Sequence, residues 1–116
     1  MAHEVPGYAF SYMSSGDIRQ FRAVVVTAAG VEEVSAADNA IDGIAQMPAD
    51  NASPETIRVM QSGISFAIAG DTVSAGDDLV TDDQGRLVAG SYANDNIIGK
   101  AVSSGAVGEE IAVLLK

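Results

Sequence analysis

The sequence contains no cysteine and no tryptophan, only one histidine, and six lysines and arginines against 16 aspartates and glutamates. Without cysteine there is no disulfide framework, no thiol nucleophile and no cysteine metal ligand. The formal net charge of −10 argues against binding to nucleic-acid phosphates, which needs a footprint of Lys and Arg. It also argues against anionic membrane surfaces, and no apolar run approaches the roughly 20 residues that span a bilayer. We therefore expect neither a nucleic-acid partner nor a membrane partner.

Groups for catalysis are equally scarce. The only histidine, His3, lies close to the N-terminus and is better explained as an exposed residue than as a general base. No G-x-S-x-G elbow, P-loop or H-E-x-x-H motif occurs, and Gly70, Gly76 and Gly85 do not form a dinucleotide-binding fingerprint. We expect no catalytic residue, no cofactor and no enzymatic activity, with a hydrolase of non-standard acidic site as the least favoured alternative.

Residues 68–90 concentrate acidic side chains and raise the alternative of a metal site. This stretch contains the aspartates Asp71, Asp77, Asp78, Asp82 and Asp83. In an EF-hand loop aligned on Gly85, the first ligand would have to be Val80, so the pattern fails. Adjacent aspartates on a strand point to opposite faces, whereas Asp and Gly suit the backbone angles of turns. The segment predicts turns and no metal, with Val73 turned inward and Gly85 at positive φ.

The residues that are abundant favour short strands. Hydrophobic residues, mostly Ala, Val and Ile, make up 47% of the 116 residues, and there are 12 glycines, which fits one all-β domain. Apolar runs and alternation predict strands at 24–26, 56–61, 64–69, 78–81, 86–89, 97–102 and 110–115. In the third of these, Ile64 and its alternate neighbours face one way, and Ser65 and its alternate neighbours face the other. Residues 31–46 stay open between a weak strand, one helical turn and a loop.

The two halves of the chain resemble each other. Residues 25–46 are similar to residues 79–102, and residues 43–60 are similar to residues 99–115. Each half reads as two strands joined by a turn, an irregular stretch, and two further strands. We expect two similar β units that form a small β-barrel or β-sandwich, since this buries both apolar faces and limits free strand edges.

The first 20 residues differ from the rest. They hold half of the six aromatic residues, and their charges nearly balance while the remainder carries the acidic excess. We predict an extended N-terminal arm at 1–20 attached to a body at 21–116, and a frayed terminus is the alternative. The candidate contact residues, with a larger partner or between subunits, are Tyr8, Phe10, Tyr12, Arg19 and Phe21.

Four motifs follow one another in the second half of the sequence. A G-D-x-V-x-x-G-D-x-L/V element at Gly70–Leu79 precedes a D-x-x-G-x-L/V hairpin at Asp82–Val88. An I-G-x-A strand at Ile98–Ala101 and a G-E-x-I/V-x-V strand at Gly108–Val113 complete the series. In this order they resemble the small capsid cement (head decoration) proteins of tailed bacteriophages. The resemblance covers residues 22–116 and leaves out the first 20 residues.

The resemblance implies a role without enzymatic activity. Cement proteins are small β-barrels or β-sandwiches, usually trimers, that bind the capsid exterior, bridge neighbouring major capsid proteins and reinforce the DNA-filled head. It therefore implies a virion protein assembled in the host cytoplasm, with the major capsid protein and its own copies as partners. Because large apolar side chains can anchor it, we expect deletion of residues 2–20 to abolish capsid binding while the body stays folded.

Two other interpretations stay open. A tail, baseplate or fibre-associated β domain of a phage would share the acidic, cysteine-free, β-rich character. A lipoyl or biotinyl carrier domain also uses the G-D-x-V-x-x-G-D element, but it needs a lysine at an exposed hairpin tip. Here Lys100 lies within a predicted strand and Lys116 is the last residue, so the carrier domain is less favoured.

Overall fold

The computed structural model describes residues 5–6, 9–35, 41–50, 52, 55–90 and 97–115, with side chains described from residue 11 onward. These residues form eleven β-strands and no helix, so the predicted all-β class is confirmed. The strands are β1 (Val5–Pro6), β2 (Ala9–Met13), β3 (Ala23–Thr27), β4 (Gly30–Glu33), β5 (Gly43–Ala45), β6 (Thr56–Met60), β7 (Gly63–Ile68), β8 (Asp78–Thr81), β9 (Leu87–Ala89), β10 (Gly99–Ala101) and β11 (Glu110–Leu115). Within the described ranges, no helix is long and apolar enough to cross a membrane.

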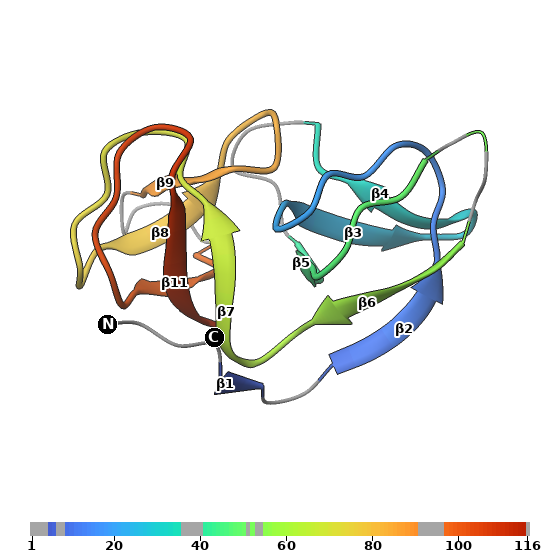
Figure 1. The fold of residues 1–116 in the computed structure, drawn as a ribbon, viewed down its shortest axis with the longest axis horizontal. Coiled ribbons are helices and arrows are strands. Elements are labelled where there is room, and N and C mark those ends of the chain that lie inside the picture. Colours follow the sequence, from blue (N-terminus) through green and yellow to red (C-terminus); the bar gives the residue numbers. More distant parts are fainter. Residues whose placement is uncertain are drawn as a thin grey trace.

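Two antiparallel sheets lie side by side along the longest axis of the molecule (Figure 1). The principal extents of the molecule are 36 × 28 × 22 Å. One sheet has the strand order β2-β6-β5-β3-β4, and the other has the order β1-β7-β11-β10-β8-β9. We call strands β2–β6 the first unit and strands β7–β11 the second unit. Numbered within its own unit, each sheet runs first, fifth, fourth, second and third strand, and β1 is added at the edge of the second. The shared order confirms the prediction of two similar β units.

Backbone hydrogen bonds outside the strands repeat as well. Ile18 exchanges two hydrogen bonds with Ala49, at 2.9 and 2.8 Å, and Val73 exchanges two with Gly105, at 2.8 and 3.0 Å. The amide that follows β2 donates to the carbonyl of Glu55 at 2.8 Å, and the amide that follows β7 donates to that of Glu109 at 2.9 Å. Strand β2 is therefore the counterpart of β7, so the first unit begins inside the predicted arm.

The described part of the predicted arm belongs to both sheets. Strand β1 pairs with β7, and β2 pairs with β6 along five residues from Ala9↔Met60 to Met13↔Thr56. Ile18 is 2% exposed. Deleting residues 2–20 would remove a strand and a core side chain from the first unit, contrary to the expectation that the body stays folded without them. The division into residues 1–20 and 21–116 as domains stays a prediction.

All seven predicted strand segments are strands, and residues 31–46 contain β4 and β5, with 36–40 outside the described residues. In β7 the predicted alternation holds, but the fully buried face carries the small residues: Ser65 and Ala67 are fully buried, whereas Ile64, Phe66 and Ile68 are half-buried. The buried face points into a core that contains Ala67, whereas Phe66 on the other face packs against Phe21 of the first unit.

Two apolar cores explain the arrangement. The smaller core lies on one face of the first unit, around Val24, Ile57 and Val59, and is closed by Ile18 and Ala49 from loops. The larger core joins the units: it contains residues of the second unit together with residues from the other face of the first unit's sheet. The first unit's sheet is thus buried on both faces, which fixes how the units meet.

Candidate interaction surfaces

The seam between the two units is built around Phe21. This residue has φ 62°, the left-handed region that L residues rarely adopt, and its counterpart in the second unit is Gly76, with φ 96°. The amide of Phe21 donates to the carbonyl of Ala45 at 2.8 Å, as that of Gly76 donates to Ala101 at 2.8 Å. The Phe21 ring meets Phe66 edge to face, with centroids 5.8 Å apart. A tertiary contact between the units thus holds a backbone conformation that glycine would adopt freely.

Arginines next to Phe21 hold the β8–β9 hairpin. Arg19 binds Glu33 through Nη2–Oε2 at 2.6 Å and Nε–Oε1 at 3.1 Å, and this hydrogen bonding raises the pKa of Arg19. The Arg22 guanidinium donates to the carbonyl of Gln84 at 2.8 Å. Burial, followed by the nearby charge of Arg19, lowers the pKa of Arg22. The guanidinium groups therefore join the hairpin tip of the second unit to the first unit.

The hairpin tip requires glycine at its closest approach. Gly85 has φ 73°, which confirms the predicted positive φ, and its carbonyl accepts from the amide of Ala23 at 2.8 Å. A Cβ atom at Gly85 would lie 3.2 Å from the carbonyl oxygen of Ala23. Both the backbone angle and the space therefore favour glycine here.

The aspartates of residues 68–90 shape turns. Asp82 accepts hydrogen bonds from the amides of Gln84 and Arg86, at 2.8 and 2.9 Å, and pairs with Nε of Arg86 at 2.8 Å. Asp77 accepts from the amide of Ser74 at 2.9 Å. The predicted turn role is confirmed for these two residues. Among the described residues, no group of three or more His, Cys, Asp and Glu side chains is placed to hold a metal.

Four of the five residues predicted to make contacts are among the described residues, and they are spread over the first unit. Tyr8 lies outside the described residues. Phe10 is in β2, where its backbone pairs with Val59 of β6. Tyr12 lies on the same strand and is 41% exposed. Arg19 and Phe21 lie at the seam, where both make the intramolecular contacts given above. Tyr12 in β2 and Arg19 are therefore exposed to solvent, whereas Phe21 is half-buried at the seam.

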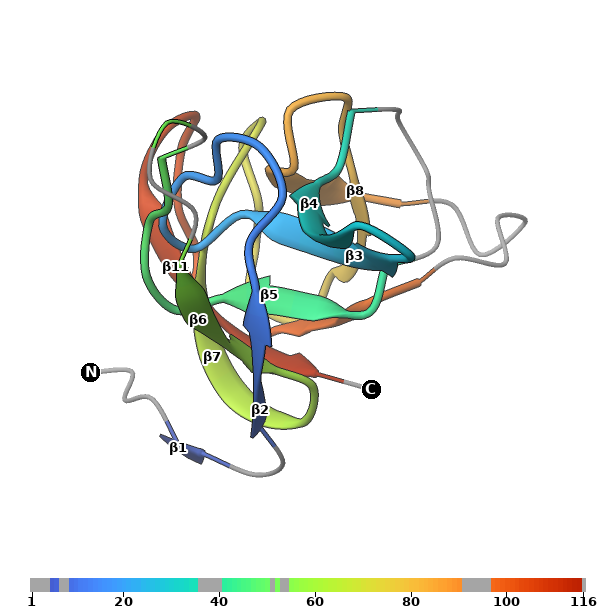
Figure 2. The same ribbon diagram turned by 90° about the vertical axis from the view of Figure 1, so that its right-hand side faces the viewer.

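We call the surface formed by β2 and the β3–β4 turn of the first unit the front edge. Strand β2 ends the order of its sheet, and only its C-terminal end meets β4, where Ser14 bridges to Val31 and the amide of Ser15 donates to the carbonyl of Val31 at 2.8 Å. Figure 2 shows β2 on the outer side of this unit. Met13 on this strand is 49% exposed, and Ala28 and Ala29 in the turn are exposed. An exposed edge strand with apolar side chains is a template for association with another chain.

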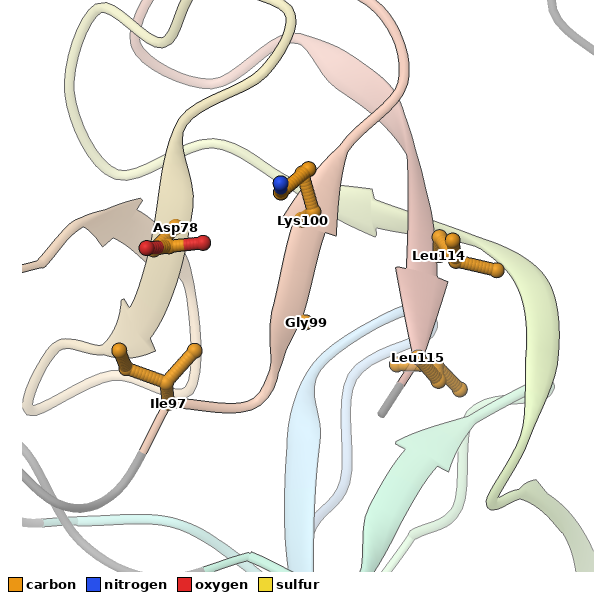
Figure 3. A pocket seen from close by; sticks show the side chains of 6 residues that line it. All are labelled: Asp78, Ile97, Gly99, Lys100, Leu114 and Leu115. Atoms are coloured by element: carbon orange, nitrogen blue, oxygen red, sulfur yellow. The ribbon is translucent and has the colours of Figure 1, made fainter.

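A second surface lies on the second unit and was not found by sequence reasoning. In the register of the sheet, Lys100 stands between Asp78 and Leu114. Figure 3 shows these side chains around a groove of about 340 Å³, which Ile97, Gly99 and Leu115 also line. Leu114 is 49% exposed, and Val102, which follows β10, is 42% exposed. We call this surface, with Val102, the rear face of the second unit.

Comparison with known proteins identifies a similar fold. No protein-family model matches the chain, and no curated protein matches it. Among solved structures, the head fiber gp8.5 N base in bacteriophage phi29 is similar, with a TM-score of 0.82 and 16% sequence identity. The match covers 94% of this chain and 95% of that chain. At this identity the likeness establishes the shared all-β fold, over nearly the full length of both chains.

Proposed function

We propose that this chain is a structural protein of a bacteriophage virion that binds the exterior of the head. In this proposal it is assembled in the host cytoplasm, forms a homotrimer, and bridges neighbouring major capsid proteins so that the DNA-filled head is reinforced. It has no enzymatic role and needs no cofactor. The observation that carries the proposal is the fold shared with a phage head fiber base over nearly the whole of both chains.

The surface chemistry supports a location outside the head. The formal net charge is −10, and exposed acidic residues such as Asp71, Asp83 and Glu109 lie in the loops of the second unit. Such a surface is unsuited to the DNA inside a head and keeps an exposed protein from associating non-specifically. The capsid contact expected from the sequence involves the N-terminal aromatic residues, of which Tyr12 is exposed and Tyr8 and Phe10 are further candidates.

The proposal is tested by comparing virions produced with and without this chain. Cryo-electron microscopy of the two particles should show difference density on the outer surface of the head. Particles without the chain should release their DNA at a lower temperature. Difference density on the tail would instead favour the tail or baseplate interpretation. If both particles are identical in density and in DNA release, the proposed function is wrong.

A contact by the arm is tested by adding the free protein back to heads that lack it. Tyr12→Ser should lower the occupancy, because an exposed aromatic anchor is lost. Val107→Ser, which removes a 57% exposed side chain from a loop of the second unit, is the matched control and should leave occupancy unchanged. Equal occupancy of both variants would place the capsid contact away from β2.

A further inference from the structure

Corresponding faces of the two units differ in burial: one is covered and the other is open to solvent. In the first unit, Ile44 stands between Ala23 and Met60 in the register, and all three are fully buried in the core that joins the units. The counterpart of Ile44 is Lys100, flanked by Asp78 and Leu114. This is the rear face of the second unit, which is open to solvent. The face by which the first unit binds the second is therefore repeated on the second unit without a partner.

The second unit covers the buried face of the first unit through specific contacts. Strand β7 and the β8–β9 hairpin of the second unit supply the contacts. The Gln46 side chain donates to Oγ of Ser65 at 2.9 Å, the amide of Ile68 donates to the carbonyl of Phe21 at 3.3 Å, and the hairpin binds Ala23 as described. The counterparts of β7 and of this hairpin are β2 and the β3–β4 turn. These form the front edge, which is open as well.

Each chain therefore has one uncovered counterpart of each surface that forms the seam: the rear face on the second unit and the front edge on the first unit. In Figure 1, β2 of the front edge and β8 of the rear face lie toward opposite ends of the long axis. Exposed apolar side chains mark both surfaces. Of the large hydrophobic residues exposed in the described part of the chain, two lie on the front edge and two on the rear face, and the remaining two are Val26 and Val107.

We propose that copies of this chain associate head to tail, with the rear face of one copy's second unit covering the front edge of the next copy's first unit. The contact would repeat between chains the packing that joins the two units within a chain. By this equivalence Val102, the counterpart of Gln46, reaches β2 of the next copy. The inference rests on the homo-oligomer of the proposed function and gives it a specific interface. Head-to-tail contacts close into rings or continue as filaments, and a trimer is the ring of three.

The contact between chains differs from the seam in composition. Lys100 and Asp78 replace Ile44 and Ala23 at the centre of the face. Leu114, in place of Met60, stays apolar. A more polar face is soluble when it is uncovered, so we expect an association that reverses on dilution.

Light scattering coupled to size exclusion tests the proposal on the free protein without capsids. Leu114→Glu blocks the rear face, and Met13→Glu blocks the front edge. We expect the unaltered chain to form an oligomer at high concentration and each variant alone to be monomeric. An equimolar mixture should give a dimer with one copy of each variant, because the intact rear face of one still meets the intact front edge of the other. Val107→Glu, on an exposed loop, should leave the oligomer unchanged.

Each contrary result overturns the proposal. If Met13→Glu keeps the oligomer while Leu114→Glu loses it, the interface is a two-fold contact between rear faces. If the mixture stays monomeric, or the unaltered chain is monomeric at high concentration, the surfaces do not bind each other. Thermal unfolding of each variant keeps these readings separate from misfolding. Because no head is present, failure here is distinct from failure to bind a capsid.

Discussion

Two opposing effects meet at Phe21. Its left-handed backbone, φ 62°, costs an L residue about 1–2 kcal/mol. Its half-buried ring pairs with Phe66 at 5.8 Å. Half of the ~1.5–3 kcal/mol for full burial, with about 0.5–1.5 kcal/mol for an aromatic pair, gives about 2 kcal/mol of stabilisation. The ring therefore outweighs or balances the strain that it imposes.

Two substitutions separate these effects. Phe21→Ala loses the ring and keeps the strain, so it should lower the free energy of unfolding by about 2 kcal/mol. Phe21→Gly loses the same ring and relieves the strain. The greater freedom of glycine in the unfolded chain takes back about 0.4–1 kcal/mol. The glycine variant should therefore be about 0.5–1 kcal/mol more stable than the alanine variant.

Urea unfolding followed by circular dichroism measures this difference, with equal slopes of free energy against urea required of both variants. Ala75→Gly, in an exposed turn where φ is not positive, is the control and should lose about 0.4–1 kcal/mol. At position 21 the glycine variant should therefore be more stable than the alanine variant, whereas at position 75 alanine should be more stable than glycine. If Phe21→Ala is as stable as Phe21→Gly, the left-handed strain is not present and this account of the seam is wrong.

Two further predictions concern turns and the N-terminal strand. Asp82→Ala should lower the free energy of unfolding by about 1–3 kcal/mol, since it leaves the amides of Gln84 and Arg86 without their acceptor. Asp83→Ala, at an exposed position, should change it by no more than about 0.5 kcal/mol. Equal losses of stability for the two variants in chemical denaturation would contradict the turn role of Asp82. Deletion of residues 2–20 should destabilise the first unit by more than the ~1.5–3 kcal/mol for burying Ile18 alone, and amides of β6 should exchange faster; unchanged protection of β6 would show that β2 is dispensable.

The strands of the second unit could be predicted because local pattern and tertiary environment agree there. Apolar alternation in 64–69 and the turn residues around Gly76 and Gly85 directly reflect the pleat and the positive φ angles that the fold uses. The side of β7 that is most buried could not be predicted. It depends on the first unit filling the core beside Ser65 and Ala67, which is a contact between residues distant in the sequence.

Strand β2 was missed for a different reason. The nearly balanced charge of the first 20 residues suggests an arm, and the repeat predicted from the sequence begins only at residue 25. A usable signal was present, since Ser14-Ser15-Gly16-Asp17-Ile18 follows β2 as Ala69-Gly70-Asp71-Thr72-Val73 follows β7. Extending the repeat toward the N-terminus would have placed β2 beside β6. The candidate residues would then have been divided between an exposed edge and an internal seam.

The open rear face follows from the duplication itself. When two equal units pack head to tail in one chain, one front and one rear surface are used, and one of each is left over. Polar replacement of both would be the simplest way to keep a monomer soluble. On the rear face, Lys100 and Asp78 are polar, but Leu114 and Val102 are apolar and exposed. Met13 on the front edge is also apolar and exposed. Apolar residues that persist on both leftover surfaces, and on matching positions, are better explained by a partner copy than by chance exposure.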